Sequence, residues 1–219
     1  MKPLERCQLY TFIDTQYLHS RSVTQVAELL CAGGSDLIQL RAKGESPKSV
    51  KAMAEEILPI TDRAGVGLVI NDHPQVASAV GAHYCHLGQE DFFDAGYQEV
   101  SQVLPAGSRM RIGLSSHSPE QAQRALKAGA AYLGVGPVFA TPTKPGAQPA
   151  SLDYVRWATG HISIPWFAIG GITLASLDDV LKAGARRICV VSAILKAPDV
   201  VKACQEFKKR LPSLPISTC

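Results

Sequence analysis

Residues 118–140 read SPEQAQRALKAGAAYLGVGPVFA and contain one complete helix-then-strand unit. Ser-Pro at its start is a helix-initiation signal, and Ala128-Gly129 is a termination signal because glycine readily takes the left-handed conformation that closes a helix. The run Tyr132–Phe139 follows almost at once and is nearly continuously apolar. Such a run is typical of a strand that is buried on both faces of a parallel sheet.

The same unit recurs along the chain. A small residue and a glycine mark helix ends at 32–33, 64–65, 80–81, 106–107, 128–129, 159–160 and 183–184. Eight apolar runs accompany them at 7–14, 36–41, 66–72, 83–91, 109–116, 132–139, 164–171 and 187–194. This alternation predicts a (β/α)8 TIM barrel, with a doubly wound α/β sheet as the alternative. We expect a single domain over 1–219, with the barrel at about 7–211 and a loose tail at 212–219.

Composition excludes several classes of protein. Hydrophobic residues make up 46% of the 219 and charged residues 19%, so the chain has enough apolar side chains for a core. The net charge of +3 is too weak to indicate a nucleic-acid partner. The sequence has neither an apolar run long enough for a membrane span nor a signal-peptide pattern. The six cysteines show no metal-ligand spacing, and we expect reduced thiols in a cytoplasmic protein.

Polar residues at the ends of the apolar runs are the candidates for function, because active sites of such barrels form at the carboxyl ends of the strands. Arg41, Lys43 and Lys144 are cations that suit phosphate oxygens. Asp72 and Asp91 end neighbouring runs, and two carboxylates beside phosphate-binding cations suit Mg²⁺.

The ends of the last two runs indicate a second site. Gly170-Gly171 and Val191-Ser192 stand after predicted strands seven and eight, where backbone N–H groups of such barrels often hold a phosphate. The sequence therefore predicts two phosphorylated ligands, one bound with a metal and one bound through the backbone.

Structural roles are the alternative for each of these residues. Asp72 can cap a helix, Asp91 can be a loop charge, and Ser115 can be a turn residue. Gln39 and Arg41 can form a buried polar pair that ties the barrel together. The functional interpretation depends on all of them falling on one end of one barrel.

The histidines show no convincing metal-ligand spacing. His73, His83 and His86 do not form a zinc pattern, and we expect His117 to begin the next helix.

Seven short motifs with barrel spacing carry a family resemblance. They are QLRAK (39–43), IND (70–72), HLGQED (86–91), GLSSHS (113–118), GVGPVFATPTKPGA (134–147), AIGGIT (168–173) and VVSAI (190–194). In this order they closely resemble the thiamine-phosphate synthase family, over about residues 9–196. The resemblance implies a transferase that joins hydroxymethylpyrimidine diphosphate to a thiazole phosphate and releases pyrophosphate, using Mg²⁺. Its partners would be these two small molecules, with no nucleic acid and no membrane, and a homo-oligomer is left open.

The resemblance also implies roles for individual residues. The pyrimidine diphosphate would contact Gln39, Leu40, Arg41, Ala42, Lys43, Asn71, Ser115 and Lys144. Of these, Arg41, Lys43, Ser115 and Lys144 would be catalytic, and Asp72 and Asp91 would carry the Mg²⁺. The thiazole phosphate would contact Thr141, Pro142, Thr143, Gly171, Val191 and Ser192.

Two features of the sequence lead to further hypotheses. His73 stands where this family often has an acidic residue, and we expect it to be tolerated because Asp72 keeps the metal position; a change in metal affinity is the hypothesis to test. The stretch Thr141–Pro149, TPTKPGAQP, is a candidate lid because it is long and rich in proline and glycine.

Three rival functions fit the same fold. A thiazole tautomerase resembles the synthases at the thiazole-phosphate loops but tends to lose the diphosphate and metal residues, which this chain retains. A non-catalytic binding or regulatory protein would show a damaged site. An aldolase would use Lys43 or Lys144 as a Schiff-base lysine, and both have diphosphate-binding neighbours.

Overall fold

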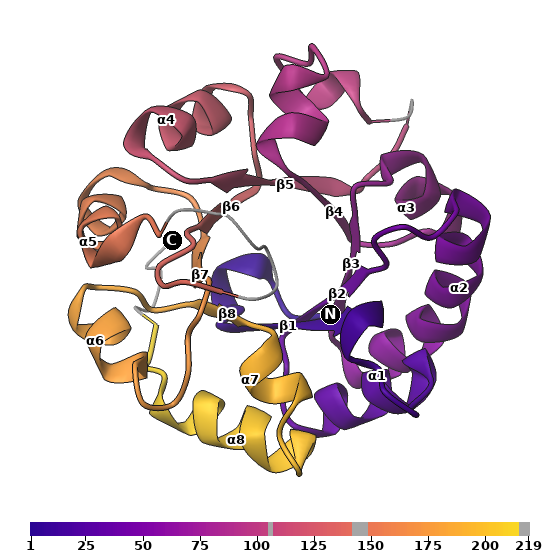
Figure 1. Cartoon of the computed structure of the whole chain (residues 1–219). Coiled ribbons are helices and arrows are strands. Elements are labelled where there is room, and N and C mark those ends of the chain that lie inside the picture. The colour runs from indigo at the N-terminus through magenta and orange to yellow at the C-terminus, as the bar shows by residue number, and fades with distance from the viewer. Residues whose placement is uncertain (105–106, 142–148, 215–219) are drawn as a thin grey trace.

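The computed structural model describes residues 1–104, 107–141 and 149–214. Eight parallel strands form a closed barrel in the order β1-β2-β3-β4-β5-β6-β7-β8, which confirms the predicted (β/α)8 fold. The strands are β1 (Leu9–Asp14), β2 (Leu37–Arg41), β3 (Gly67–Asn71), β4 (Tyr84–Leu87), β5 (Arg111–Ser116), β6 (Tyr132–Val135), β7 (Trp166–Ile169) and β8 (Ile188–Val190). Figure 1 looks along the barrel and shows the helices in a ring around it.

The α-helices follow the strands along the chain. They are α1 (Val23–Ala32), α2 (Pro47–Ala64), α3 (Pro74–Val80), α4 (Pro119–Lys127), α5 (Ser151–His161), α6 (Leu177–Lys182), α7 (Ser192–Leu195) and α8 (Val200–Arg210). Ser118 starts α4 as predicted, by accepting a hydrogen bond from a backbone N–H of the first turn, and Ser22 and Ser46 cap α1 and α2 in the same way. No helix in the described part of the chain is both long enough and apolar enough to cross a bilayer.

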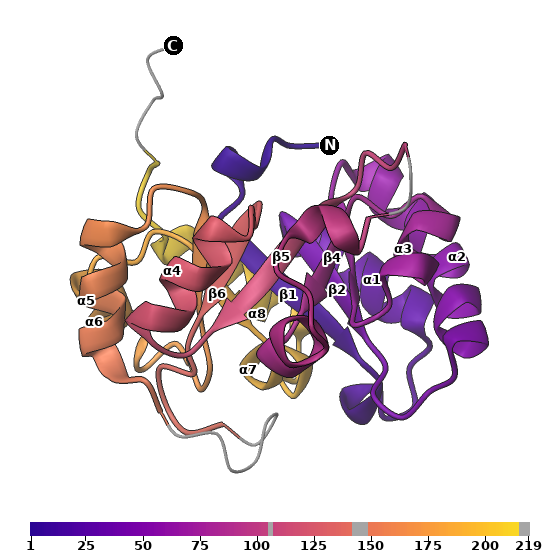
Figure 2. The same ribbon diagram turned by 90° about the horizontal axis from the view of Figure 1, so that it is seen from above.

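Two hydrophobic clusters stabilise the barrel. The larger one lies between the sheet and the helices and contains residues such as Leu30, Ile57 and Val155. The smaller one fills the inside of the barrel with the rings of Tyr10, Phe12, Tyr84, Tyr132 and Phe167, together with smaller side chains. The 3₁₀ turn η1 (Leu4–Arg6) inserts Leu4 into this inner cluster and, as Figure 2 shows, lies near the N-terminus at one end of the barrel. The opposite end, where the strands finish, is therefore the one available for a site.

The segment after β4 differs from the expected pattern. Between Gly88 and Leu104 the described residues form a π-helical turn, η3 (Glu90–Asp94), and a 3₁₀ turn, η4 (Val100–Gln102), and no α-helix. The helix expected before 106–107 is therefore wrong for this part of the chain. Gly96, two residues after the end of η3, has a φ of 94°, and a residue in that conformation cannot continue a right-handed helix.

Two of the expected helix ends also differ. Gly34, with a φ of 86°, takes the left-handed position after α1, and Gly33 stays in the right-handed region. Gly160 lies inside α5, which continues to His161. A small residue followed by glycine therefore marks most helix ends here, but it does not identify the exact residue at which each helix ends.

Candidate active site

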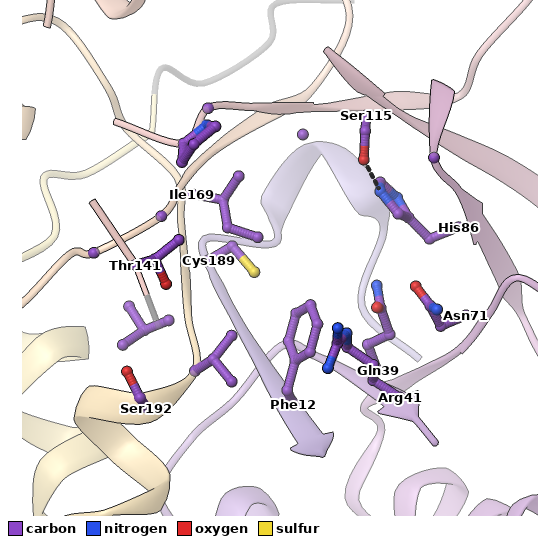
Figure 3. A pocket seen from close by; sticks show the side chains of 18 of the residues that line it. Phe12, Gln39, Arg41, Asn71, His86, Ser115, Thr141, Ile169, Cys189 and Ser192 are labelled. Atoms are coloured by element: carbon purple, nitrogen blue, oxygen red, sulfur yellow. Dashed lines mark hydrogen bonds between the residues drawn. The ribbon is translucent and has the colours of Figure 1, made fainter. Parts of the chain in front are cut away.

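A pocket of about 560 Å³ opens at the carboxyl ends of the strands. Figure 3 shows two walls that carry different side chains. Gln39, Arg41 and Asn71 lie together on one wall, and Thr141 and Ser192 lie on the other. Apolar side chains from β1, β7 and β8 lie between the walls: Phe12, Ile169 and Cys189. The pocket thus presents two polar walls of different composition with apolar side chains between them.

Arg41 is held in the first wall by a buried carboxylate. Its Nη1 lies 2.7 Å from Oδ2 of Asp14, the last residue of β1, whose side chain is fully buried. Asp14 Oδ1 also accepts a hydrogen bond from the backbone N–H of Gln16, at 3.0 Å. Because both oxygens of Asp14 are engaged, the direction of the guanidinium is constrained.

The two carboxylates named from the sequence lie beside each other and beside a lysine. Asp72 forms an ion pair with Lys43 and lies close enough to Asp91 to affect its ionisation. Burial and the neighbouring Asp72 raise the pKa of Asp91 above its ordinary value. Two carboxylates that repel each other in this way are suited to a shared cation.

The backbone brings this pair together in an unexpected way. Strand β4 ends at Leu87, so Asp91 stands in the π-helical turn η3 and not at the strand end where the sequence placed it. Phe92 and Phe93 are buried in the core, which pulls the chain into this turn directly after the strand. Asp72 follows β3 with a φ of 63°, a conformation that aspartate tolerates better than most residues.

Ser115, near the end of β5, lies on the pocket beside a histidine. Its Oγ is 2.9 Å from Nε2 of His86 on β4, the contact marked in Figure 3. Its carbonyl oxygen accepts a hydrogen bond from Gln89 Nε2 at 2.5 Å. Burial lowers the pKa of His86 to about 4, so this imidazole is neutral near pH 7.

The second wall is formed largely by backbone. Gly170 and Gly171, after β7, have φ values of 101° and 65°. A Cβ on Gly171 would lie 2.6 Å from the carbonyl oxygen of Ala140, so the double glycine allows two loops to approach closely. Val191 and Ser192, at the start of α7, line the pocket on the same side.

Some residues named from the sequence lie away from the pocket or outside the described part of the chain. The side chains of Leu40 and Ala42 pack in the cluster between the sheet and the helices, because alternate residues of a strand face opposite sides. Leu40 and Ala42 can therefore contact a ligand in the pocket only through their backbone atoms. Pro142, Thr143 and Lys144, and most of the candidate lid, lie outside the described residues.

Sequence reasoning missed the pocket residues Phe12 and His86, and it missed Asp14, which is buried behind the pocket as the partner of Arg41. Asp14 ends the first apolar run in the same way that Arg41 and Asp72 end the next two, so the sequence did contain a signal for it. His86 carried a weaker signal, because a histidine inside an apolar run has no spacing that points to a metal. His117 does not begin α4 as expected: Ser118 is the N-cap and Pro119 the first helical residue, and His117 lines the pocket just before them.

Among the residues that the structure describes, no group of three or more histidine, cysteine, aspartate or glutamate side chains is arranged to hold a metal ion. The two carboxylates at 72 and 91 are nevertheless compatible with Mg²⁺, which commonly takes one or two carboxylates and completes its shell with water and substrate phosphate.

The family model for thiamine monophosphate synthase matches residues 9–194. The chain belongs to this family. The matched range spans the barrel from β1 into α7 and so includes every described pocket residue discussed above.

Curated relatives agree with the family assignment. Thiamine-phosphate synthase of Thermus thermophilus is 48% identical over 84% of this chain and 86% of its own. The enzyme of the same name from Chloroflexus aurantiacus is 41% identical over 92% of this chain and 91% of its own. The chain is therefore a transferase of the thiamine-phosphate synthase family.

Solved structures give the same result. Thiamine phosphate pyrophosphorylase from Pyrococcus furiosus superposes with a TM-score of 0.82 at 30% identity, covering 94% of this chain and 96% of the other. A 3-hexulose-6-phosphate synthase superposes with a TM-score of 0.63 at 18% identity, which reflects a shared barrel fold alone.

Proposed function

We propose that this member of the thiamine-phosphate synthase family joins hydroxymethylpyrimidine diphosphate to hydroxyethylthiazole phosphate and releases pyrophosphate. The observation that carries the proposal is the two-walled pocket. One wall has Arg41, Lys43 and the carboxylates of Asp72 and Asp91, and the other has the double glycine and the start of α7. The first wall suits a diphosphate with its metal, and the second suits a single phosphate held by backbone N–H groups.

The proposed assignment of ligands follows from charge. Arg41 and Lys43 would bind diphosphate oxygens, with Lys144 assigned the same role by its motif alone. Gln39, Asn71 and Ser115 would bind polar atoms of the same substrate. Thr141, Pro142, Thr143, Gly171, Val191 and Ser192 would receive the thiazole phosphate, and Phe12 and Ile169 would separate the reacting rings from water.

When the bond between the pyrimidine methylene group and the diphosphate breaks, negative charge develops on the pyrophosphate. The wall with Arg41, Lys43, Asp72 and Asp91 is arranged to neutralise this charge. Mg²⁺ held by Asp72 and Asp91 would supply charge neutralisation on the leaving oxygens when bound. Arg41, oriented by Asp14, contributes a fixed positive charge. Lys43 pairs with Asp72 in this structure. When a metal cation takes the place of the lysine beside Asp72, the Lys43 side chain can turn to a diphosphate oxygen.

The remaining step requires no nucleophile from the protein. Departure of pyrophosphate leaves a pyrimidine-methyl cation that is stabilised by the amino group of the ring, and the thiazole nitrogen attacks it. The task of the pocket is to hold the two rings in line and to exclude water, which would otherwise capture the cation.

The test is pyrophosphate release from hydroxymethylpyrimidine diphosphate, measured with and without thiazole phosphate and Mg²⁺, for the parent and for Asp91→Ala. We expect release that needs both substrates and the metal and that falls at least 100-fold in the variant. A well-folded parent that releases no pyrophosphate would overturn the proposal and move attention to tautomerisation of the thiazole phosphate.

We further propose a cytoplasmic location. The five cysteines among the described residues are unpaired thiols, as is usual for proteins of a reducing compartment. Labelling of the protein in fractionated cells would test this, and recovery outside the cytoplasmic fraction would contradict it.

A further inference from the structure

Five polar side chains form a hydrogen-bonded chain across the inside of the barrel. Gln39 Nε2 donates to the hydroxyl of Tyr10, whose oxygen is 3.0 Å from that of Tyr132. The Tyr132 hydroxyl is 3.3 Å from Nδ1 of His86, and Nε2 of His86 is 2.9 Å from Ser115 Oγ. The five residues come from β2, β1, β6, β4 and β5. The chain therefore connects two residues of the pocket, Gln39 and Ser115, through tyrosines in the inside of the barrel.

The two tyrosines in the middle are buried away from water. Tyr10 is 3% exposed and Tyr132 is 0% exposed. Burial raises the pKa of both hydroxyls well above the ordinary value, so both stay protonated. Since His86 is neutral near pH 7, its ring carries a single N–H. Each hydrogen bond between neighbouring side chains then contains one hydrogen. All the donors therefore point the same way along the series of five residues.

The amide of Gln39 sets that direction. Because its nitrogen donates to Tyr10, the hydrogen of Tyr10 is directed to Tyr132 and the hydrogen of Tyr132 to Nδ1 of His86. The imidazole is then protonated on Nε2 and donates to Ser115 Oγ. Ser115 keeps its own hydrogen for an acceptor in the pocket. The reverse order, with the amide turned over, would make Ser115 donate to His86.

Packing holds the chain in this arrangement. Gly113 of β5 has no side chain, and a Cβ there would lie 2.1 Å from Cζ of Tyr132. The ring of Tyr132 fills this space, packs edge-on against Tyr10 and Phe167, and stacks on His86 with centroids 5.6 Å apart. A ring enclosed in this way has little freedom to move its hydroxyl away from His86.

We propose that Tyr10 and Tyr132 are positioning residues that hold His86 as its Nε2–H tautomer and so present Ser115 to the pyrimidine diphosphate as a hydrogen-bond donor. Neither tyrosine touches the ligand with its hydroxyl in this scheme; both act through His86. The tautomer depends on the protein alone, whereas the identity of the ligand rests on the proposed function.

The first experiment measures the tautomer directly. Protein labelled with ¹⁵N in its histidines is recorded at pH 7, and the His86 signals are assigned by their loss in His86→Gln. We expect an unprotonated Nδ1 and a protonated Nε2 in the parent, and a mixture of tautomers in Tyr132→Phe. A protonated Nδ1 in the parent, or an unchanged signal in Tyr132→Phe, would overturn the proposal whether or not the protein is a synthase.

The second experiment measures KM and kcat for Tyr132→Phe and Tyr10→Phe. We expect KM for the pyrimidine diphosphate to rise about tenfold, the effect of about one hydrogen bond, with KM for the thiazole phosphate unchanged. Tyr84→Phe is the matched control, because its ring packs on Tyr132 but its hydroxyl binds Arg111 at 2.7 Å instead of joining the chain.

The pattern of the three variants decides the result. Equal losses in Tyr84→Phe and Tyr132→Phe would show that the rings matter only for packing, and unchanged KM in Tyr132→Phe would show that Ser115 needs no positioning. Absence of pyrophosphate release from the parent would count against the proposed function, and the tautomer measurement would then decide this inference separately.

Discussion

Asp14 orients Arg41 on the pocket wall that also carries Lys43, Asp72 and Asp91. It is fully buried at the end of β1, and Arg41 at the end of β2 is its partner in the barrel register. A buried carboxylate without its cation is costly, so the pair holds together. Arg41 is therefore less free to move than an arginine at a pocket edge would be, and its charge is directed before any ligand arrives.

We expect Asp14→Asn to lower kcat/KM for the pyrimidine diphosphate by about tenfold, because Arg41 loses the charge that orients it. Steady-state kinetics would measure this beside Arg41→Gln and the double variant. If Asp14 acts through Arg41, the double variant is no worse than Arg41→Gln alone. Losses that multiply would show that Asp14 acts independently.

His73 stands before α3 and makes no capping hydrogen bond with its side chain. His73→Asp supplies a carboxylate at this N-cap position, and we expect thermal or urea unfolding to show about 1 kcal/mol more stability.

The same variant, His73→Asp, tests whether the residue beside Asp72 affects metal binding, through the Mg²⁺ dependence of pyrophosphate release. Curves identical to those of the parent would contradict an effect of His73 on metal affinity.

At the scale of elements, the turn between β4 and η3 decides where the second carboxylate lies. Gly88 begins this turn, and a Cβ on it would be 2.9 Å from Oδ2 of Asp91. A backbone hydrogen bond from Gly88 also lowers the pKa of Asp91, against the larger raising effects of burial and Asp72. The absence of a side chain at residue 88 therefore makes room for the carboxylate beside Asp72.

We expect Gly88→Ala to raise the Mg²⁺ concentration needed for half-maximal activity several-fold, because the new methyl group displaces the Asp91 carboxylate. Titration of activity with Mg²⁺ measures this. Gly160→Ala is the control, since a Cβ there meets nothing within 4 Å and adds helix propensity inside α5. Equal Mg²⁺ requirements in the two variants would contradict the role given to Gly88.

At the scale of the whole molecule, Asp36 joins distant parts of the chain at the end of the barrel opposite the pocket. Its Oδ1 is 2.8 Å from Nζ of Lys2, and its Oδ2 pairs with Lys208 of α8. Oδ2 also accepts from the backbone N–H groups of Gln8 and Leu9, at 2.7 and 3.0 Å. Burial alone would raise the pKa of Asp36, but these hydrogen bonds outweigh it and the pKa is lowered.

We expect Asp36→Asn to reduce the free energy of unfolding at pH 7 by about 3 kcal/mol, as for other broken buried ion pairs. Because the pKa is lower in the folded protein, this stabilisation is present above the ordinary aspartate pKa of about 3.9 and is lost as the pH falls through the folded value. Urea unfolding at pH 7 and at lower pH measures it, and the gap between parent and variant should narrow on acidification.

Glu55→Gln is the control for this measurement, because the Lys51–Glu55 pair is exposed on α2. We expect it to change stability by at most about 0.5 kcal/mol. A loss in Asp36→Asn no larger than that of Glu55→Gln would contradict the role of Asp36.

The sequence by itself determined the barrel, its strand order and most of the polar residues at the strand ends. It could do so because burial of a parallel strand on both faces, helix capping and strand-end placement are local patterns, visible at Ser118, Gly129 and Arg41 without knowledge of distant residues. The family motifs depended on the same local spacing.

Only the tertiary structure decided how side chains from different strands meet. That Asp14 holds Arg41, that Asp91 reaches Asp72 from a π-helical turn, and that Tyr132 connects to His86 are results of barrel closure. Residues far apart in sequence become neighbours when eight strands close, and the free energy of burying their polar groups then depends on partners that no local pattern specifies.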